Sequence, residues 1–135
     1  MSATSSTMEK TGAARAWLAT VDSLLSQIEQ WAAEEDWQVA RLKAKRLSEG
    51  ELGTYRVSDL RIRTHSGILN VVVVTGRTVG GHGRVDLVAF PTLDRFVLIW
   101  KGEHWVVKAD SGQTWPKRWS RKTFVDIAER LTRTS

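Results

Sequence analysis

The sequence predicts an α+β protein: an N-terminal amphipathic helix, a curved antiparallel sheet of about six strands in meander order, and a C-terminal helix packed on the sheet. Apolar residues recur every three or four positions from about Gly12 to Glu35, which is the spacing of one helix face. After Asp36 the spacing changes to two, and strand-like segments follow one another through short turns, which is typical of a meander. Helical spacing returns from about Arg121 to Thr132.

The length and composition indicate one globular domain. Of the 135 residues, 41% are hydrophobic and 26% are charged, and the absence of cysteine excludes disulfides and thiolate zinc sites. No apolar run approaches the roughly 20 residues that span a bilayer, so we expect no membrane partner. Glu9, Lys10 and Arg15 interrupt the start of the chain, which therefore lacks the apolar core of a signal peptide. We expect a disordered tail over residues 1–11, a single domain over 12–135, and a cytoplasmic protein.

The first helix carries a broad apolar stripe. Its members are Trp17, Leu18, Val21, Leu24, Leu25, Ile28, Trp31 and Ala32. This stripe is wider than a strict coiled-coil seam and suits a helix that lies across a sheet. Only about three heptads are available, so self-association through this helix is possible but not required.

The sheet is predicted from six segments with strand character. In "WQVARLKAKRL" the alternation places Arg41, Lys43 and Lys45 on one face, and in "TYRVSDLRIRT" a phase shift at Ser58–Asp59 predicts a bulge. The run "ILNVVVV" is typical of a central strand buried on both faces.

The last three strand segments are "RVDLVAF", "RFVLIW" and "HWVVKA". A two-residue turn at Gly102–Glu103 would join the last two as a hairpin, with Trp100 opposite Trp105.

The net charge of +5 is distributed unevenly along the chain. The segment from Glu9 to Asp36 has six acidic and two basic residues, whereas Arg41 to Arg63 has seven basic and three acidic residues. Two interpretations stay open: complementary packing, within one domain or across a dimer, or a basic face that binds an external anion.

The segment before the last helix, "DSGQTWPKRWSRKTF", combines capping signals with clustered cations. Ser120 stands at the N-cap position, and Trp119 and Phe124 occupy the two positions of a hydrophobic staple. The basic residues of this cluster are Lys117, Arg118, Arg121 and Lys122. Cations are unfavourable at a helix N-terminus unless an anion joins them. That anion is either a carboxylate of the acidic first helix or a phosphate of a ligand.

The glycine-rich segment "TGRTVGGHGR" is a possible functional loop, with Arg77, His82 and Arg84 as its candidate residues. It matches neither the P-loop nor the dinucleotide-binding pattern, and it connects two strands. The three histidines lack metal-ligand spacing, and no nucleophile or carboxylate pair forms a recognisable catalytic motif. We therefore assign no catalytic residue, metal or cofactor, and the sequence favours a protein that is not an enzyme.

Two functional hypotheses follow. The first is a protein-interaction module, supported by the broad helical stripe and by seven tryptophans, a residue favoured at interface hot spots. The second is a nucleic-acid-binding domain. Its basic sheet face and its stacking and phosphate-contact segment would comprise Arg41, Lys43, Lys45, Arg61, Arg63, Trp115, Lys117, Arg118, Arg121 and Lys122. Nucleic-acid platforms interleave aromatic with basic residues, whereas these strands offer only Trp37, so the first hypothesis is favoured.

Overall fold

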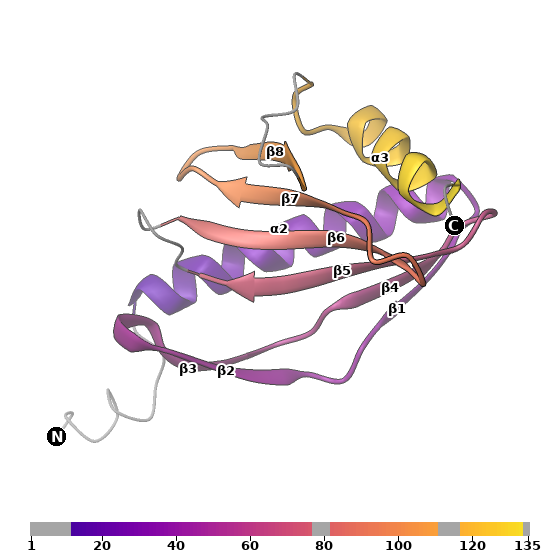
Figure 1. Ribbon diagram of the computed structural model, residues 1–135. Helices are drawn as coiled ribbons and strands as arrows, with labels where there is room; N and C mark the ends of the chain where they lie inside the picture. The colour runs from indigo at the N-terminus through magenta and orange to yellow at the C-terminus, as the bar shows by residue number, and fades with distance from the viewer. Residues whose placement is uncertain (1–11, 77–81, 111–116, 134–135) are drawn as a thin grey trace, which may run out of the picture.

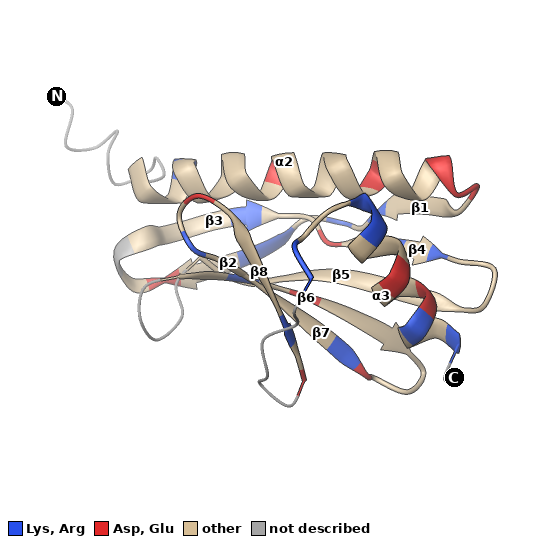
Figure 2. Ribbon diagram, turned by 90° about the horizontal axis from the view of Figure 1, so that it is seen from above, with Lys and Arg blue, Asp and Glu red and all other residues tan. Residues whose placement is uncertain are grey.

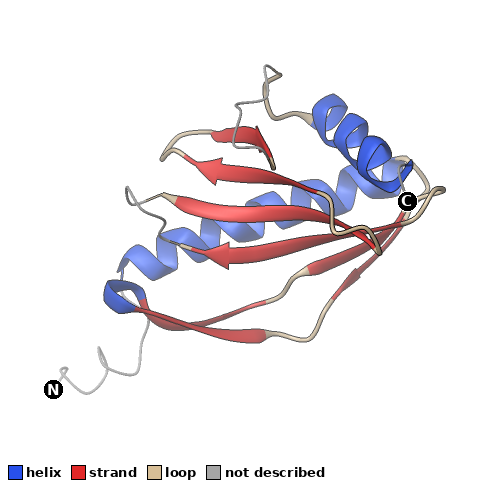
Figure 3. Cartoon of the chain, viewed as in Figure 1, coloured by secondary structure: helices blue, strands red, loops and turns tan. Residues whose placement is uncertain are grey.

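The computed structural model describes residues 12–76, 82–110 and 117–133, and it confirms the predicted α+β class (Figure 1). The helices are α2 (Gly12–Glu34) and α3 (Arg121–Arg133), and a 3-10 turn, η1, covers Gly50–Leu52. The strands are β1 (Gln38–Arg41), β2 (Lys45–Glu49), β3 (Gly53–Val57), β4 (Leu60–Arg63), β5 (Ile68–Thr75), β6 (Gly83–Phe90), β7 (Arg95–Trp100) and β8 (Trp105–Ala109). Figure 3 shows these elements by type. The predicted tail over residues 1–11 lies outside the described residues.

The main sheet has six antiparallel strands in the order β1-β4-β5-β6-β7-β8, as predicted. The two N-terminal strand segments differ from the prediction, because each is broken into two. The C-terminal part of the first segment, β2, pairs with the N-terminal part of the second, β3. These two strands form a separate two-stranded ribbon that leaves the main sheet. Between the two pairs, Leu42 N–H still donates to the carbonyl of Asp59, at 2.9 Å.

Two carboxylates bind the end of β5 where the ribbon leaves the sheet. Asp59 Oδ1 accepts the backbone N–H of Val73 at 2.9 Å, and Lys45 Nζ lies 3.0 Å from the same oxygen. Ser58–Asp59, predicted as a bulge, is therefore the break between β3 and β4. The side chain of Asp59 supplies an acceptor that the continuing strand would otherwise provide.

Glu49, at the end of β2, makes the second link. Its carboxylate accepts hydrogen bonds from the Tyr55 and Thr75 hydroxyls and from Gly76 N–H, at 3.0 Å for the last. Tyr55 is only 2% exposed. Burial, and then the hydrogen bond to Glu49, raise the pKa of the Tyr55 phenol. The ribbon is thus attached to β5 through side chains rather than through a backbone ladder.

α2 ends where Asp36 adopts a left-handed backbone conformation, with φ of 61°. Trp37 N–H donates to the carbonyl of Ala32 and Asp36 N–H to that of Ala33, at 3.0 Å each, which is the Schellman arrangement. The turn sends the chain directly into β1 and buries Trp37, whose ring packs on Phe124 of α3 at 6.1 Å between centroids.

Both described helices pack on the same face of the main sheet. Figure 2 shows α2 running along one side of the strands. Most of its apolar stripe is buried against the inward side chains of the sheet, with Leu18 and Trp31 partly buried. Phe124, Ile127 and Ala128 of α3 are fully buried in the same core cluster. Most of the stripe is therefore occupied by contacts within the chain.

The β7–β8 hairpin matches the prediction. Trp100 pairs with Trp105 across the strands, their ring centroids 5.1 Å apart, and Gly102 has φ of 94° in the turn. A glycine suits this position because side chains are strained at positive φ.

Candidate functional site

The face of the main sheet opposite α2 and α3 carries apolar and charged residues together. We call it the open face and define it by the outward residues of β4 to β8. Pair register places on it Arg61, Arg63, Ile68, Asn70, Val72, Arg84, Asp86, Val88, Phe90, Arg95, Val97, Ile99, Val106 and Lys108. No described helix covers this face, and Val88 lies outside the main core cluster although it is only 7% exposed.

The prediction that "ILNVVVV" is buried on both faces holds only in part for β5. Leu69, Val71 and Val73 are completely buried beneath the helices, whereas on the open face Asn70 is 7% exposed and Val72 is half-buried. Burial on the open face is therefore incomplete. Asp86 separates Val72 of β5 from Val97 of β7, whereas Val97 and Ile99 of β7 adjoin Val106 of β8 in an apolar row that is only half-buried in the described chain.

Asp86 lies at the centre of the open face and is held by two arginines. Arg84 Nε and Nη2 donate to its two oxygens at 2.7 and 3.0 Å, and Arg95 Nη1 donates at 3.1 Å. Asp86 is 3% exposed, and its hydrogen bonds from Arg84, followed by its negative charge, raise the pKa of the Arg84 guanidinium. A second carboxylate, that of Asp110 just beyond β8, lies 3.9 Å from Arg95 Nε, so two carboxylates accompany the two arginines.

The sequence interpretation missed this cluster, although part of its signal was available. Arg84 and Asp86 are two positions apart in a strand, which puts them on one face. Arg95 comes from the neighbouring strand and joins them only through the register of β6 and β7, in which Val97 lies opposite Asp86. That register is a tertiary property.

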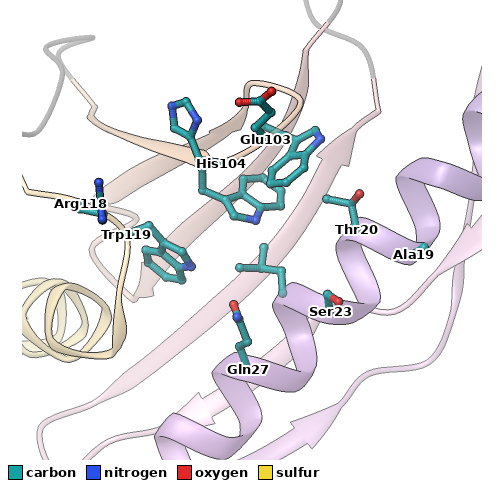
Figure 4. Close-up of a pocket in the computed structure, with 11 residues that line it drawn as sticks. Ala19, Thr20, Ser23, Gln27, Glu103, His104, Arg118 and Trp119 are labelled. Carbon is teal, nitrogen blue, oxygen red and sulfur yellow. The ribbon is translucent and has the colours of Figure 1, made fainter.

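A pocket of about 850 Å³ opens on the helical side of the molecule (Figure 4). Its indoles are those of Trp100, Trp105 and Trp119, and Figure 4 shows Gln27 entering from α2 and Arg118 from the segment before α3. Glu103 of the β7–β8 turn also lines the pocket, so the pocket carries charges of both signs. This mixture favours no single class of ligand.

The segment before α3 has the predicted capping geometry. Ser120 Oγ accepts the backbone N–H of Thr123 at 3.3 Å, and Trp119 contacts Phe124 with ring centroids 6.0 Å apart. The packing role predicted for Trp119 is therefore confirmed. Trp115, predicted to stack on bases, lies outside the described residues.

The cations around the start of α3 find carboxylates within the chain. Arg121 Nε lies 2.7 Å from Glu34, and its Nη2 donates to Glu35 at 2.7 Å. Lys117 Nζ lies 3.4 Å from Asp126. The first of the two predicted anions, a carboxylate of the acidic helix, is thus present. Two cluster members, Arg118 and Lys122, are exposed and make no ion pair within the described residues.

The five basic strand residues do not share a face. Arg41 lies on the helical side, where it bonds Glu29 at 2.8 Å and Asp22 at 3.4 Å, and this pairing raises its pKa. Lys43 lies in the break between β1 and β2, and Lys45 pairs with Asp59. Of the five, only Arg61 and Arg63 belong to the open face. Trp37 is buried, so it does not accompany them.

The candidate loop residues are separated by the fold. Arg77 lies outside the described residues, His82 is half-buried, and Arg84 belongs to the Asp86 cluster. Two glycines of this segment have a packing role. A side chain at Gly76 would lie 2.5 Å from Leu52, and one at Gly83 would overlap the ring of Trp17. These glycines allow the indole to lie against the ends of β5 and β6.

Among the described residues, no group of three or more His, Asp or Glu side chains is placed to hold a metal ion. Within 12–76, 82–110 and 117–133, neither helix is long and apolar enough to cross a membrane. Comparison with protein-family models, with curated proteins and with solved structures finds no match.

Proposed function

We propose that this protein is a non-enzymatic module that binds another protein through the open face of its sheet. The apolar row on that face is the observation that carries the proposal. An antiparallel sheet with one solvated face normally alternates apolar-in with polar-out. Here Val97, Ile99 and Val106 point outward side by side on β7 and β8 and are half-buried. Contiguous apolar surface of this kind marks binding sites.

The charges of the open face favour an acidic partner. Its basic residues are Arg61, Arg63, Arg84, Arg95 and Lys108. Asp86 pairs with Arg84 and Arg95, and Asp110, just beyond β8, lies 3.9 Å from Arg95, so basic residues outnumber acidic ones by five to two. A second copy of this chain would bring the same cations face to face, and like charges across an interface are unfavourable. A partner with acidic and apolar side chains complements both features.

The test is a selection of random peptides displayed on phage against the purified protein, followed by measurement of affinity for the enriched peptides. We expect enriched sequences that combine acidic with apolar residues. Val97→Lys, which places a charge in the apolar row, should lower the affinity for these peptides by about tenfold or more. Ala33→Lys, on the exposed side of α2, is the matched control and should leave affinity unchanged.

Both variants must first show the thermal midpoint of the wild type within a few degrees, so that loss of binding is not loss of folding. Peptides that bind Val97→Lys as tightly as the wild type would place the docking surface elsewhere. Dimerisation that is broken by Val97→Lys, measured by sedimentation, would replace the acidic partner with a second copy.

A nucleic-acid-binding role is the second candidate, because Arg118 and Lys122 are exposed without a carboxylate partner in the described chain. It has less support, since Phe90 is the only aromatic residue of the open face as defined above. Fluorescence anisotropy with single-stranded and duplex oligonucleotides at about 50 and 200 mM salt tests it. Saturable binding that collapses at the higher salt and in an Arg118→Ala/Lys122→Ala variant would favour nucleic acid over protein.

A further inference from the structure

The Arg84–Asp86–Arg95 cluster is held in place before any partner arrives. Asp86 is buried and uses both oxygens, so each guanidinium is fixed against the sheet by at least one charge-assisted hydrogen bond. Arg84 and Arg95 nevertheless remain about one-third exposed, at 35% and 36% of their side chains. Fixed side chains lose little further freedom on binding, which makes them suitable contact points.

We infer that Arg84 and Arg95 together anchor a carboxylate side chain of the docked partner. This inference rests on the proposed function, because it names the chemistry that the open face recognises. A guanidinium has five N–H donors. Arg84 uses its Nε and Nη2 on Asp86 and leaves Nη1 free within the described residues. Arg95 uses Nη1, and its Nε has only a 3.9 Å approach to Asp110.

The spare donors make the anchored group an acceptor, and a carboxylate is the acceptor that pairs best with a guanidinium. Asp86 and, at 3.9 Å from Arg95, Asp110 occupy only part of the donor set, so a purely apolar partner that covered the cluster would leave the remaining N–H groups without an acceptor. A carboxylate from the partner accepts these spare guanidinium donors. Val72 and Val97, which flank Asp86 across the neighbouring strands, exclude water once the partner is docked. The contact is therefore stronger in the complex than on a bare surface.

The direct experiment is an NMR titration of the ¹⁵N-labelled full chain with N-acetyl-glutamate methylamide, which presents one side-chain carboxylate. The glutamine analogue is the matched uncharged probe. We expect saturable shifts at the Arg84 and Arg95 Nε–H signals and at neighbouring amides of β6 and β7, with the charged probe alone. No saturation up to about 100 mM, or equal shifts with both probes, overturns the anchor.

Single substitutions then assign the anchor to these residues. Arg84→Gln and Arg95→Gln each leave Asp86 with one arginine, so the buried carboxylate stays paired. Each should lower the affinity for the glutamate probe and for the selected peptides by about tenfold or more. Arg63→Gln, at an exposed arginine near the edge of the same face, is the matched control and should change affinity less than about twofold. Equal effects in all three variants would reduce the anchor to general charge attraction and overturn it.

The outcomes separate this inference from the proposed function. If peptides bind the wild type, and this binding is lost in Val97→Lys but unchanged in Arg84→Gln and Arg95→Gln, the docking face stands and the anchor is wrong. If no peptide docks while the glutamate probe saturates at the two arginines, the carboxylate site stands and protein docking is wrong.

Discussion

Tyr55 shows how one side chain links stability to pH. Its phenol is buried and donates to Glu49, and both effects raise its pKa above the ordinary value of about 10. Above that pH the unfolded chain releases the proton while the folded chain keeps it, so stability falls as the pH rises. The stability that the buried Tyr55 phenol contributes is fully present below the ordinary tyrosine pKa of about 10.

We expect the difference in unfolding free energy between wild type and Tyr55→Phe to change with pH. At pH 8 the wild type should be more stable by about 1 kcal/mol, the ordinary worth of one hydrogen bond. Between about pH 9 and pH 11 this advantage should shrink, because only the wild type has a tyrosine to titrate. Urea denaturation at each pH measures it, and a constant difference would mean that the pKa is not raised.

Gly83 is the second residue whose environment gives a clear prediction. A Cβ there would overlap the Trp17 ring, which is 5% exposed and packed in the core. We expect Gly83→Ala to lower the free energy of unfolding by about 1–3 kcal/mol, the usual cost of overpacking. Gly67→Ala is the control, because its Cβ would meet Thr132 at an ordinary 3.4 Å. Equal stability of the two variants, measured by thermal denaturation, would contradict the packing argument.

At the scale of elements, α3 depends on its capped entry. Ser120 satisfies the N–H of Thr123, and the Trp119–Phe124 staple sets the angle at which the chain enters the helix. Ser120→Ala should destabilise the protein by about 1 kcal/mol. Ser26→Ala, at an exposed position inside α2, should be neutral or slightly stabilising because alanine is the better helix former. Chemical denaturation measures the stability of both variants. A larger loss of stability in Ser26→Ala than in Ser120→Ala would contradict the capping role of Ser120.

At the scale of the whole molecule, the β2–β3 ribbon is distinct from the six-stranded sheet. It is linked to β5 by the carboxylates of Glu49 and Asp59, whereas β6 has backbone partners on both sides. We expect faster amide hydrogen exchange in β2 and β3 than in β6. Asp59→Ala should speed exchange in the ribbon while leaving β6 and β7 unchanged. Uniform acceleration in all strands would mean that the ribbon opens only with the whole fold.

The charge distribution also has its meaning at this scale. The acidic first helix and the basic later segments are paired within the chain, through Arg41 with Glu29 and Arg121 with Glu34 and Glu35. The net charge of +5 therefore overstates the basic surface that an external anion meets. The cations of the open face lie on the opposite side of the sheet from these pairs.

The sequence by itself determined the elements whose causes are local. Helical spacing located α2 and α3 to within one residue at each end, the Ser120 cap and its staple defined the entry into α3, and glycine at 102 accompanied the Trp100–Trp105 hairpin. Spacing, capping and turn chemistry act over a few residues, so they can be predicted from a few residues.

Only the tertiary structure decided the features that depend on strand register and on which elements meet. An apolar run such as "ILNVVVV" is compatible with one buried face or two, and only the placement of the helices left Val72 uncovered. Asp86 joined Arg95 because β6 and β7 pair in one register, and Arg41 turned toward α2 because β1 pairs with β4. These contacts join residues that sequence spacing does not relate, since each depends on how separate elements pack together.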